Sequence, residues 1–397
     1  MNRKRFLATV GAGALAATHA VGQTASPSMP SSQPVSGPAA LPGLLTLDDV
    51  EQLAAKLMTP SAHAYVSGGA ADEHTLRWNR ERYHNIVLRQ RILRDVEIPD
   101  CATTLFGQRL SHPIILAPVG VLKLVHPEGE IATVRGAGRA EAVMCLSSGS
   151  NTAVEDVAAA ATHPLWFQLY VAKDRGLAKA LIQRVEVAGA KALEITVDGA
   201  VDGARNRQHR TPYVLPPGVG FPHYVGITEP PTEQSLDRVR AQVLLWKDIE
   251  WIRGLTKMPI LLKGVLDADD AATAVGLGVD GIIVSNHGGR CLDTLPATIE
   301  ALPAIVDRVG SRAPVLVDGG IRRGTDVLKA LALGAAAVQI GRPHAYGLAV
   351  AGAEGVAHVV RILRQELLMA MALMGCRTLA DITRESLWHP TISKNPS

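Results

Sequence analysis

The stretch IIVSNHGGR (residues 282–290) begins as an apolar segment and changes at once to polar side chains and glycines. Three consecutive aliphatic residues are typical of a strand that is buried on both faces. The residues that follow can carry chemistry, because an imidazole moves protons near neutral pH and a guanidinium holds a carboxylate by two parallel hydrogen bonds. A short apolar strand with a polar carboxyl end is the unit that the rest of the chain repeats.

Seven further segments show this pattern. The eight strand candidates are Ile114–Ala117, Val143–Ser147, Trp166–Tyr170, Leu193–Val197, Ile260–Lys263, Gly281–Ser285, Val315–Asp318 and Ala337–Gly341. Alanine-rich helical segments lie between them, including Glu130–Ala142, Thr152–Ala161, Leu177–Ala188 and Thr325–Leu333. Apolar strands that alternate with helices indicate a parallel sheet, and eight such units in about 230 residues predict a closed (β/α)₈ barrel, the TIM barrel.

The segments outside this repeat predict three additions to the barrel. Thr46–Asp49 reads as a helix-capping box, and a second helix carries Tyr65, so an N-terminal helical extension precedes the first strand. After the fourth strand, a Pro- and Gly-rich loop (Pro212–Pro231) leads into a helix through Trp246, and a loop of this length is more often functional than inert. The helical pattern of Val356–Met374 predicts packing on the barrel exterior.

The amino terminus reads as a targeting segment. Arg3-Lys4-Arg5 precedes a short apolar run and small residues, which predicts an export signal over residues 1–20 and no stable membrane span. The signal resembles a twin-arginine signal, with Lys in the second Arg position, and therefore predicts a periplasmic protein. Residues 21–43 are rich in Ser, Pro, Gly and Ala and are predicted to be a disordered linker, so that the barrel domain spans residues 44–397.

The composition limits the partners. The chain has 397 residues and a net charge of +3, and the three basic residues of the export signal supply that whole excess. A mature chain near neutrality gives no electrostatic argument for nucleic-acid binding. The four cysteines are scattered without a CxxC motif, so we predict no metal site and expect free thiols. One disulfide bond remains an alternative, because an exported protein meets oxidising conditions.

The polar residues of the chain follow the predicted strands. In such barrels the active site lies at the carboxyl ends of the strands. Those ends read Ala117–Gly120, Ser147-Ser148, Gln168–Tyr170, Thr196–Asp198, Lys263-Gly264, Ser285–His287, Asp318–Gly320 and Gly341-Arg342. So many different polar groups on one rim are hard to explain as structure alone. After the last two strands, glycines, arginines and a helix start predict a phosphate site.

Seven motifs together resemble a known family. They are SNHGGR (285–290), DGGIRRGTDVLKALALGA (318–335), IGRP (340–343), APVGVLKLVHPEGE (117–130), FQLYVAKDR (167–175), TVD (196–198) and ILLKGV (260–265). They are similar to those of the FMN-dependent α-hydroxy-acid oxidases and dehydrogenases, such as glycolate oxidase, lactate oxidase and mandelate dehydrogenase. The resemblance extends from about Leu45 to Ile382. It implies a tetrameric flavoprotein that oxidises an L-2-hydroxy acid to the 2-keto acid and passes the electrons to O₂ or to a respiratory acceptor.

The resemblance also implies a catalytic set, made up of His287, Asp198, Tyr170 and Lys263. His287 would be the base that takes a proton from the substrate, and Asp198 would fix its tautomer and stabilise the imidazolium. Lys263 would lie at the N1–C2 carbonyl edge of the flavin, where negative charge develops on reduction. Whether the substrate reacts by hydride transfer or through a carbanion is left open.

The same resemblance implies residues that bind substrate and cofactor. Arg290 and Arg205 would hold the substrate carboxylate, while Tyr65 and Tyr170 would hydrogen-bond its carboxylate and hydroxyl. The predicted residues around the isoalloxazine are Pro118, Val119, Gly120, Ser147, Gln168, Thr196, Lys263 and Ser285. Those predicted around the ribityl phosphate are Asp318, Gly320, Arg322, Gly341 and Arg342.

Four residues depart from the family pattern. Gly149 stands where glycolate oxidase has a large aromatic residue, which predicts a wider pocket and a longer or bulkier substrate. Asp202 introduces a carboxylate that we expect either to repel a plain aliphatic acid or to recruit a polar substrate tail. Cys291 stands where Gln is usual. Gly120 replaces the Ala of many oxidases, so the electron acceptor stays open.

Two other functions remain possible from the sequence. One is a different FMN- or phosphate-binding barrel, such as an isomerase or a nucleotide dehydrogenase, which would lack the joint presence of Asp198, Arg205, His287 and Arg290. The other is a flavin-binding protein without catalytic activity, against which the intact base and arginine pair argue.

Overall fold

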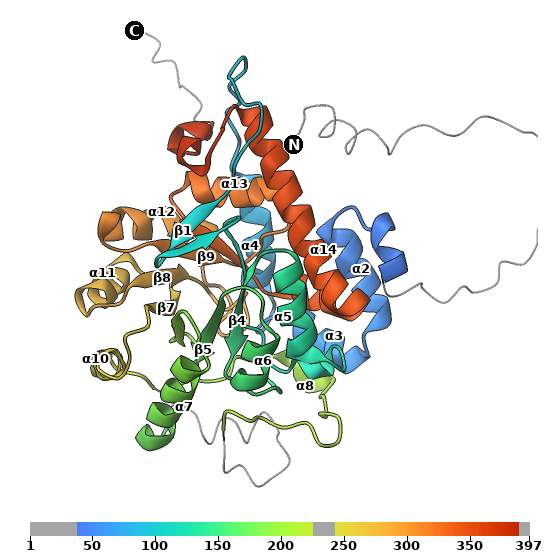
Figure 1. Cartoon of the computed structure of the whole chain (residues 1–397), viewed down its shortest axis with the longest axis vertical. Coiled ribbons are helices and arrows are strands. Elements are labelled where there is room, and N and C mark those ends of the chain that lie inside the picture. Colours follow the sequence, from blue (N-terminus) through green and yellow to red (C-terminus); the bar gives the residue numbers. More distant parts are fainter. Residues whose placement is uncertain (1–37, 225–242, 389–397) are drawn as a thin grey trace, which may run out of the picture.

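The protein is described by a computed structural model that covers residues 38–224 and 243–388 (Figure 1). The predicted export signal and most of the predicted linker lie outside these residues, as does part of the loop after the fourth strand. The last six residues of the predicted linker are ordered as a 3-10 helix, η1 (Pro38–Gly43). Leu41 of this helix packs against the hydrophobic core.

Eight parallel strands close into a barrel, which confirms the predicted (β/α)₈ fold. The strands are β3 (Ile114–Leu116), β4 (Val143–Ser147), β5 (Leu165–Leu169), β6 (Leu193–Thr196), β7 (Ile260–Val265), β8 (Gly281–Val284), β9 (Val315–Asp318) and β10 (Ala337–Ile340). Each strand pairs with the next along the chain, and β10 closes the barrel by pairing with β3. All eight predicted strands are present, with bounds that differ by a few residues at most.

Helices surround the barrel (Figure 1). They are α5 (Gly129–Arg139), α6 (Val154–Ala160), α7 (Arg175–Val187), α8 (Asn206–Arg210), α10 (Trp246–Arg253), α11 (Ala268–Gly276), α12 (Thr298–Val309), α13 (Gly324–Ala332) and α14 (Arg342–Met374). Short 3-10 helices are η2 (Leu122–Leu124), η3 (Gly310–Arg312), η4 (Leu379–Asp381) and η5 (Arg384–Ser386). One prediction needs correction, because α14 begins well before Val356, with a kink at Ala351-Gly352. The helix predicted to run through Trp246 lies largely outside the described residues, and α10 begins at Trp246.

The side chains inside the barrel change character along each strand. The first inward-facing residues are apolar, as in Ile283 of β8 and Leu261 of β7. A hairpin of β1 (Thr103–Leu105) and β2 (Gln108–Leu110) covers this amino-terminal end, where Trp166 Nε1 donates a hydrogen bond of 3.2 Å to Gln108 Oε1. The polar residues occupy the opposite, carboxyl end. The hairpin was not predicted, because its strands of three residues are too short to show a hydrophobic period.

The N-terminal extension consists of α2 (Leu47–Leu57), α3 (Pro60–Ser67) and α4 (His74–His84), of which α4 was not predicted. The capping box is confirmed, since Asp49 N donates to Thr46 Oγ1 at 3.1 Å and Thr46 N donates to Asp49 Oδ2 at 2.8 Å. Asn79 of α4 exchanges two hydrogen bonds, of 2.8 and 2.9 Å, with the side chain of Asn286 after β8. The extension is thereby attached to the carboxyl rim of the barrel.

Helix α14 is the long exterior helix that the sequence predicted, and it is apolar enough by length and composition to cross a membrane. Of its most apolar segment, however, 67% is buried inside the protein. It packs on α2, α5 and α13, and its apolar residues belong to the main hydrophobic core. Its hydropathy is therefore accounted for by packing within the fold.

The hairpin-covered end of the barrel should be a major source of stability. Trp166 is fully buried, whereas Trp388 is 57% exposed. We expect Trp166→Ala to lower the free energy of unfolding by about 3–5 kcal/mol, because the substitution leaves a large cavity. The control Trp388→Ala should change it by less than about 0.5 kcal/mol. Urea unfolding followed by circular dichroism measures both, and equal effects would contradict this account of the barrel core.

Candidate active site

One pocket opens at the carboxyl ends of the strands and collects nearly every predicted site residue. Its lining includes Tyr65, Pro118, Val119, Gly120, Ser147, Gln168, Tyr170, Thr196, Arg205, Lys263, His287, Arg290, Asp318, Gly320, Arg322, Gly341 and Arg342. The two remaining predicted residues lie directly behind the lining. Asp198 contacts His287, and Ser285 contacts Lys263. The structure therefore brings the predicted set together, although the role of each residue stays a prediction.

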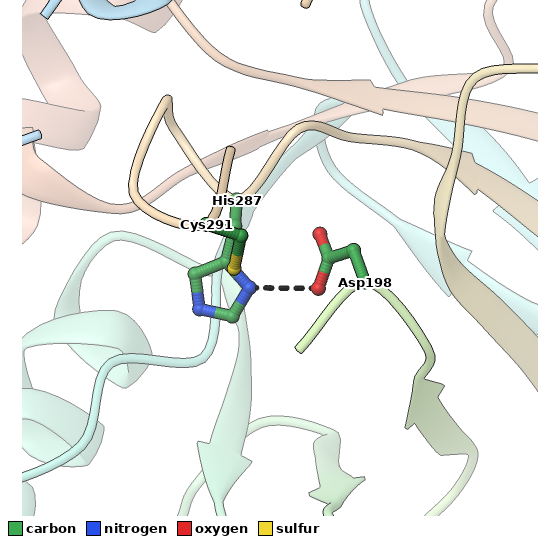
Figure 2. A group of neighbouring side chains, drawn as sticks. All are labelled: Asp198, His287 and Cys291. Carbon is green, nitrogen blue, oxygen red and sulfur yellow. Dashed lines mark hydrogen bonds and ion pairs between the residues drawn. The ribbon is translucent and has the colours of Figure 1, made fainter. Parts of the chain in front are cut away.

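His287 follows β8 in a left-handed backbone conformation, with φ of 57°. Its amide donates to Ser285 Oγ at 3.1 Å. The ring is held from both sides: Nδ1 lies 2.9 Å from Asp198 Oδ1 (Figure 2), and Nε2 lies 3.3 Å from the Tyr170 hydroxyl. Because a carboxylate can only accept, Nδ1 carries a proton, and in the neutral ring Nε2 is the atom that can accept one.

The charges around His287 favour its protonated form. Burial by itself lowers the pKa of His287, but Cys291, Tyr170 and Asp198 together raise it well above the ordinary value of 6.5. Burial likewise opposes ionisation of Asp198, yet His287 and Lys263 lower the pKa of that carboxyl group. The pair is thus an imidazolium–carboxylate pair when the ring is protonated, and a neutral base with an oriented tautomer when it is not.

The position of Asp198 depends on a glycine in β7. Gly264 has φ of 106°, and a Cβ atom there would lie 2.6 Å from both Cβ and Cγ of Asp198. Any side chain at this position would displace the carboxylate from His287. The conformation also shifts the pairing of β7 with β8 between Lys263 and Val265.

Helix α3 positions the arginine that was predicted to hold the substrate. Arg290 Nη1 donates to the carbonyl oxygens of Tyr65 and Gly68 at 2.6 and 3.1 Å, and its guanidinium carbon lies 5.2 Å from the centre of the Tyr65 ring. The Tyr65 hydroxyl donates to Gly120 O at 3.2 Å. Its ring packs edge-on against Tyr213, with centroids 5.1 Å apart.

The second arginine comes from the loop after β6. The Arg205 side chain is 14% exposed, and its Nη2 lies 3.5 Å from Asp202 Oδ1. Asp202 itself does not line the pocket. The carboxylate of Asp202 lies beside Arg205 instead, and its predicted effect on the substrate stays a prediction.

Lys263 brings a buried positive charge to the floor of the pocket. Its Nζ donates to Ser285 Oγ at 2.9 Å and lies 3.1 Å from Asp318 Oδ2, and Ser285 Oγ donates to the same Asp318 oxygen at 2.8 Å. Burial opposes the charge, but Asp318, Asp198 and Glu194 more than offset it and raise the pKa of Lys263. The lysine therefore stays cationic at all physiological pH values.

A chain of side-chain hydrogen bonds crosses three neighbouring strands beside Lys263. Gly149 N donates to Ser147 Oγ at 3.0 Å, and Ser147 Oγ donates to Gln168 Oε1 at 3.1 Å. Gln168 Nε2 then donates to Thr196 Oγ1 at 2.9 Å. This chain holds amide and hydroxyl groups in fixed positions along one wall of the pocket.

The predicted phosphate end of the pocket is strongly cationic. Arg342 is held by three carbonyl oxygens, those of Val66, Gly68 and Gly288, at 3.0, 2.8 and 2.9 Å. No ion pair to its guanidinium is found within the described ranges. Burial and the neighbouring Arg290 lower the pKa of Arg342 to about 10. An anion bound beside Arg342 would stabilise its buried positive charge.

Three residues of the site were missed. Tyr213 and Gln339 line the pocket, and Glu194 lies beneath it, accepting a hydrogen bond from Gln339 Nε2. Burial raises the pKa of Glu194 to about 7, although Lys263 and Gln339 lower it. A carboxylate and an amide inside otherwise apolar strands were the available signal. Tyr213 showed none, because it comes from a loop.

The comparisons with known proteins agree with this geometry. Residues 54–389 match the family of FMN-dependent dehydrogenases. The chain is 48% identical over 342 residues to a peroxisomal (S)-2-hydroxy-acid oxidase of Oryza sativa subsp. japonica, with 85% of this chain and 93% of that relative covered. It is 46% identical over 351 residues to an L-lactate oxidase of Nostoc sp., with coverage of 85% and 96%.

Solved structures give the same result. A structure of mandelate oxidase with benzoyl-formic acid superposes with a TM-score of 0.80 at 37% identity, covering 87% of this chain and 98% of that one. The match to the family model, residues 54–389, begins within α2 and runs through the whole barrel. The chain belongs to the family of FMN-dependent dehydrogenases.

Proposed function

We propose that the pocket catalyses the FMN-dependent oxidation of an (S)-2-hydroxy acid to the 2-keto acid, with His287 as the base. The observation that supports this most directly is the position of the imidazole. Its Nδ1 is bonded to Asp198, while the ring lines a pocket that also contains Arg205 and Arg290. A base with a fixed tautomer beside two carboxylate-binding groups suits a hydroxy-acid substrate.

The described residues fit FMN. Arg342 and Arg322 line the end of the pocket where β9 and β10 meet the starts of α13 and α14, and they would hold the phosphate. Asp318 Oδ1 and Gln339 Oε1 are buried without a hydrogen-bond partner among the described residues, although both side chains line the pocket. The ribityl hydroxyls would satisfy Asp318. Bound FMN supplies a two-electron acceptor, which no protein side chain here provides.

The protein side chains would bind the substrate, accept its proton and stabilise the charges that develop. Arg205 and Arg290 bind the carboxylate, and the hydroxyls of Tyr65 and Tyr170 orient the reacting end of the acid. His287 Nε2 takes one of the two protons that the acid loses, and Asp198 stabilises the imidazolium that forms. Lys263 would place its charge beside the bound flavin, whose reduction adds negative charge.

The substrate that we propose is longer or bulkier than glycolate. Gly149 lines the pocket together with Tyr170 and Tyr213, and it contributes no side chain to that lining. The resulting space suits an aliphatic or aromatic side chain on the substrate. The likeness to mandelate oxidase supports the same choice.

We propose O₂ as the electron acceptor, in keeping with the oxidase relatives. A tetramer and export to the periplasm remain predictions from the sequence. The residues of the proposed signal lie outside those that the structure describes.

The assignment of the base can be tested without the acceptor. We expect His287→Ala to bind FMN and stay yellow, but to slow anaerobic flavin reduction by a series of L-2-hydroxy acids about 10²–10⁴-fold, because no group replaces the base. The control is His209→Ala on α8, an exposed residue outside the pocket lining. Stopped-flow absorbance measures the rate, and fast reduction in His287→Ala would refute the assignment. Readmitting O₂ to reduced wild type then tests the acceptor by the rate at which the colour returns.

The raised pKa of His287 predicts a particular pH profile. The base must be neutral to accept a proton, so kcat/KM should fall as the pH drops through the pKa of His287 in the free enzyme, above 6.5. In Asp198→Asn the imidazolium loses its carboxylate, so this limb should move to lower pH while kcat falls, because the protonated ring is no longer stabilised. Steady-state profiles of both enzymes measure this. A limb that stays in place would contradict the role of Asp198.

The width of the pocket can be tested at Gly149. We expect Gly149→Trp to lower kcat/KM for L-mandelate and for long-chain L-2-hydroxy acids by at least tenfold, about 1.4 kcal/mol, while glycolate is affected less, because only the larger side chains need the space. Steady-state rates over a series of increasing chain length give the comparison. A uniform loss across the series would show that position 149 does not select for size.

A further inference from the structure

The imidazole ring of His287 and two neighbouring side chains form a group of three potential metal ligands. They are the carboxylate of Asp198 after β6, the imidazole of His287 after β8 and the thiol of Cys291 in the same loop (Figure 2). One ligand atom from each lies within 4.8 Å of the other two. Cys291 is partly exposed, whereas Cys101, Cys145 and Cys376 are buried. The chain separates Asp198 from His287 by 89 residues, so sequence spacing could not reveal the group.

Backbone packing holds the two loops together at this point. A Cβ atom on Gly203 would lie 2.3 Å from the carbonyl oxygens of both Arg290 and Cys291, so the loop after β6 rests directly on the loop after β8. Gly264 fixes the Asp198 carboxylate from the other side by the close contact described above. The three side chains thus converge because of the fold and are not mobile surface groups that meet by chance.

We propose that Asp198, His287 and Cys291 form a binding site for a soft divalent cation, Zn²⁺ or Cd²⁺, and that the bound cation inhibits the enzyme. Thiolate, imidazole and carboxylate are the ligands that zinc prefers, and water completes its tetrahedron. Ligands on tetrahedral zinc lie about 3.5 Å apart, so small rotations of these side chains would suffice. The inhibition rests on the proposed role of His287 as the base.

The mechanism of inhibition follows from the tautomer of His287. The cation binds the lone pair of Nδ1: the imidazolium releases its Nδ1 proton to solvent and keeps the proton on Nε2, whereas in the neutral ring the single proton moves from Nδ1 to Nε2. The thiol of Cys291 releases its proton to solvent as well. The Asp198 carboxylate, which accepted the Nδ1 hydrogen bond, becomes a ligand instead. A neutral ring with a metal on Nδ1 must carry its remaining proton on Nε2. Nε2 can then no longer accept a proton from the substrate.

The nearby positive charges make the thiolate essential. Lys263 already contributes to the low pKa of Asp198, and Arg290 immediately precedes Cys291 in the chain. A hard cation held by oxygen ligands would bind weakly here, because these positive charges repel it. A sulfur–metal bond with covalent character is what can outweigh the repulsion. The affinity should therefore depend on Cys291 above all.

The test is a titration of the FMN-loaded enzyme with Cd²⁺ in the absence of substrate, followed by the ultraviolet charge-transfer band of a cadmium–thiolate bond and by equilibrium dialysis. Wild type should bind one cation per chain with this band and lose activity in parallel, and EDTA should restore the activity. Cys291→Ser should lack the band and weaken the inhibition at least about tenfold relative to its own uninhibited rate. The matched control is Cys376→Ser, at a buried cysteine far along the chain, which should behave as wild type.

The possible results distinguish a failure of the proposed cation site from a failure of the proposed catalytic function. An unchanged band or unchanged affinity in Cys291→Ser would overturn the site. Binding that depends on Cys291 but leaves the activity intact would overturn the inhibition and would count against His287 as the base. If His287→Ala proves to reduce FMN at the normal rate, the proposed function fails, yet the charge-transfer band still decides whether the cation binds here.

Discussion

The ion pair between Lys263 and Asp318 puts a fixed positive charge inside the barrel, with 3.1 Å between Nζ and Oδ2. An ammonium group buried in a protein is stable only when carboxylates and hydrogen-bond acceptors surround it. The carboxyl ends of three neighbouring strands supply them, because β7, β8 and β9 pair in order and bring Lys263, Ser285 and Asp318 within hydrogen-bond distance of one another. Ser285 Oγ also accepts the amide of His287. The buried charge, the pocket floor and the proposed base are consequently parts of one hydrogen-bonded unit.

The fold could be predicted from the sequence because strands buried on both faces leave an unbroken apolar run. Each such run ended at a polar group, which located the rim of the barrel. The hydrogen bonds between buried polar side chains that are far apart in the chain left no comparable pattern in the sequence. Asn79 and Asn286 are 207 residues apart, and Glu194 and Gln339 are 145 apart. Which buried polar groups satisfy each other is decided by closure of the barrel, and a sequence pattern does not contain that information.

The predictions for the site divide in the same way. Residues within strand-end motifs, such as His287 and Lys263, lie in the pocket because the strand itself places them there. Residues in the loop after β6 were harder to place. Arg205 does reach the pocket, but Asp202 does not, although only two residues separate them. Loop conformation depends on what the loop packs against, and here Gly203 determines it through its contact with the Arg290–Cys291 backbone.

The three carbonyl bonds of Arg342 have a consequence for how the molecule is assembled. Two of the acceptors, Val66 and Gly68, belong to α3 and its end, so the guanidinium that we propose to hold the phosphate is oriented by a segment that precedes the barrel in the chain. The barrel strands could close before α3 docks, but Arg342 would then lack these acceptors. The N-terminal helices therefore complete the proposed cofactor site, and FMN retention becomes a check that the extension has docked correctly.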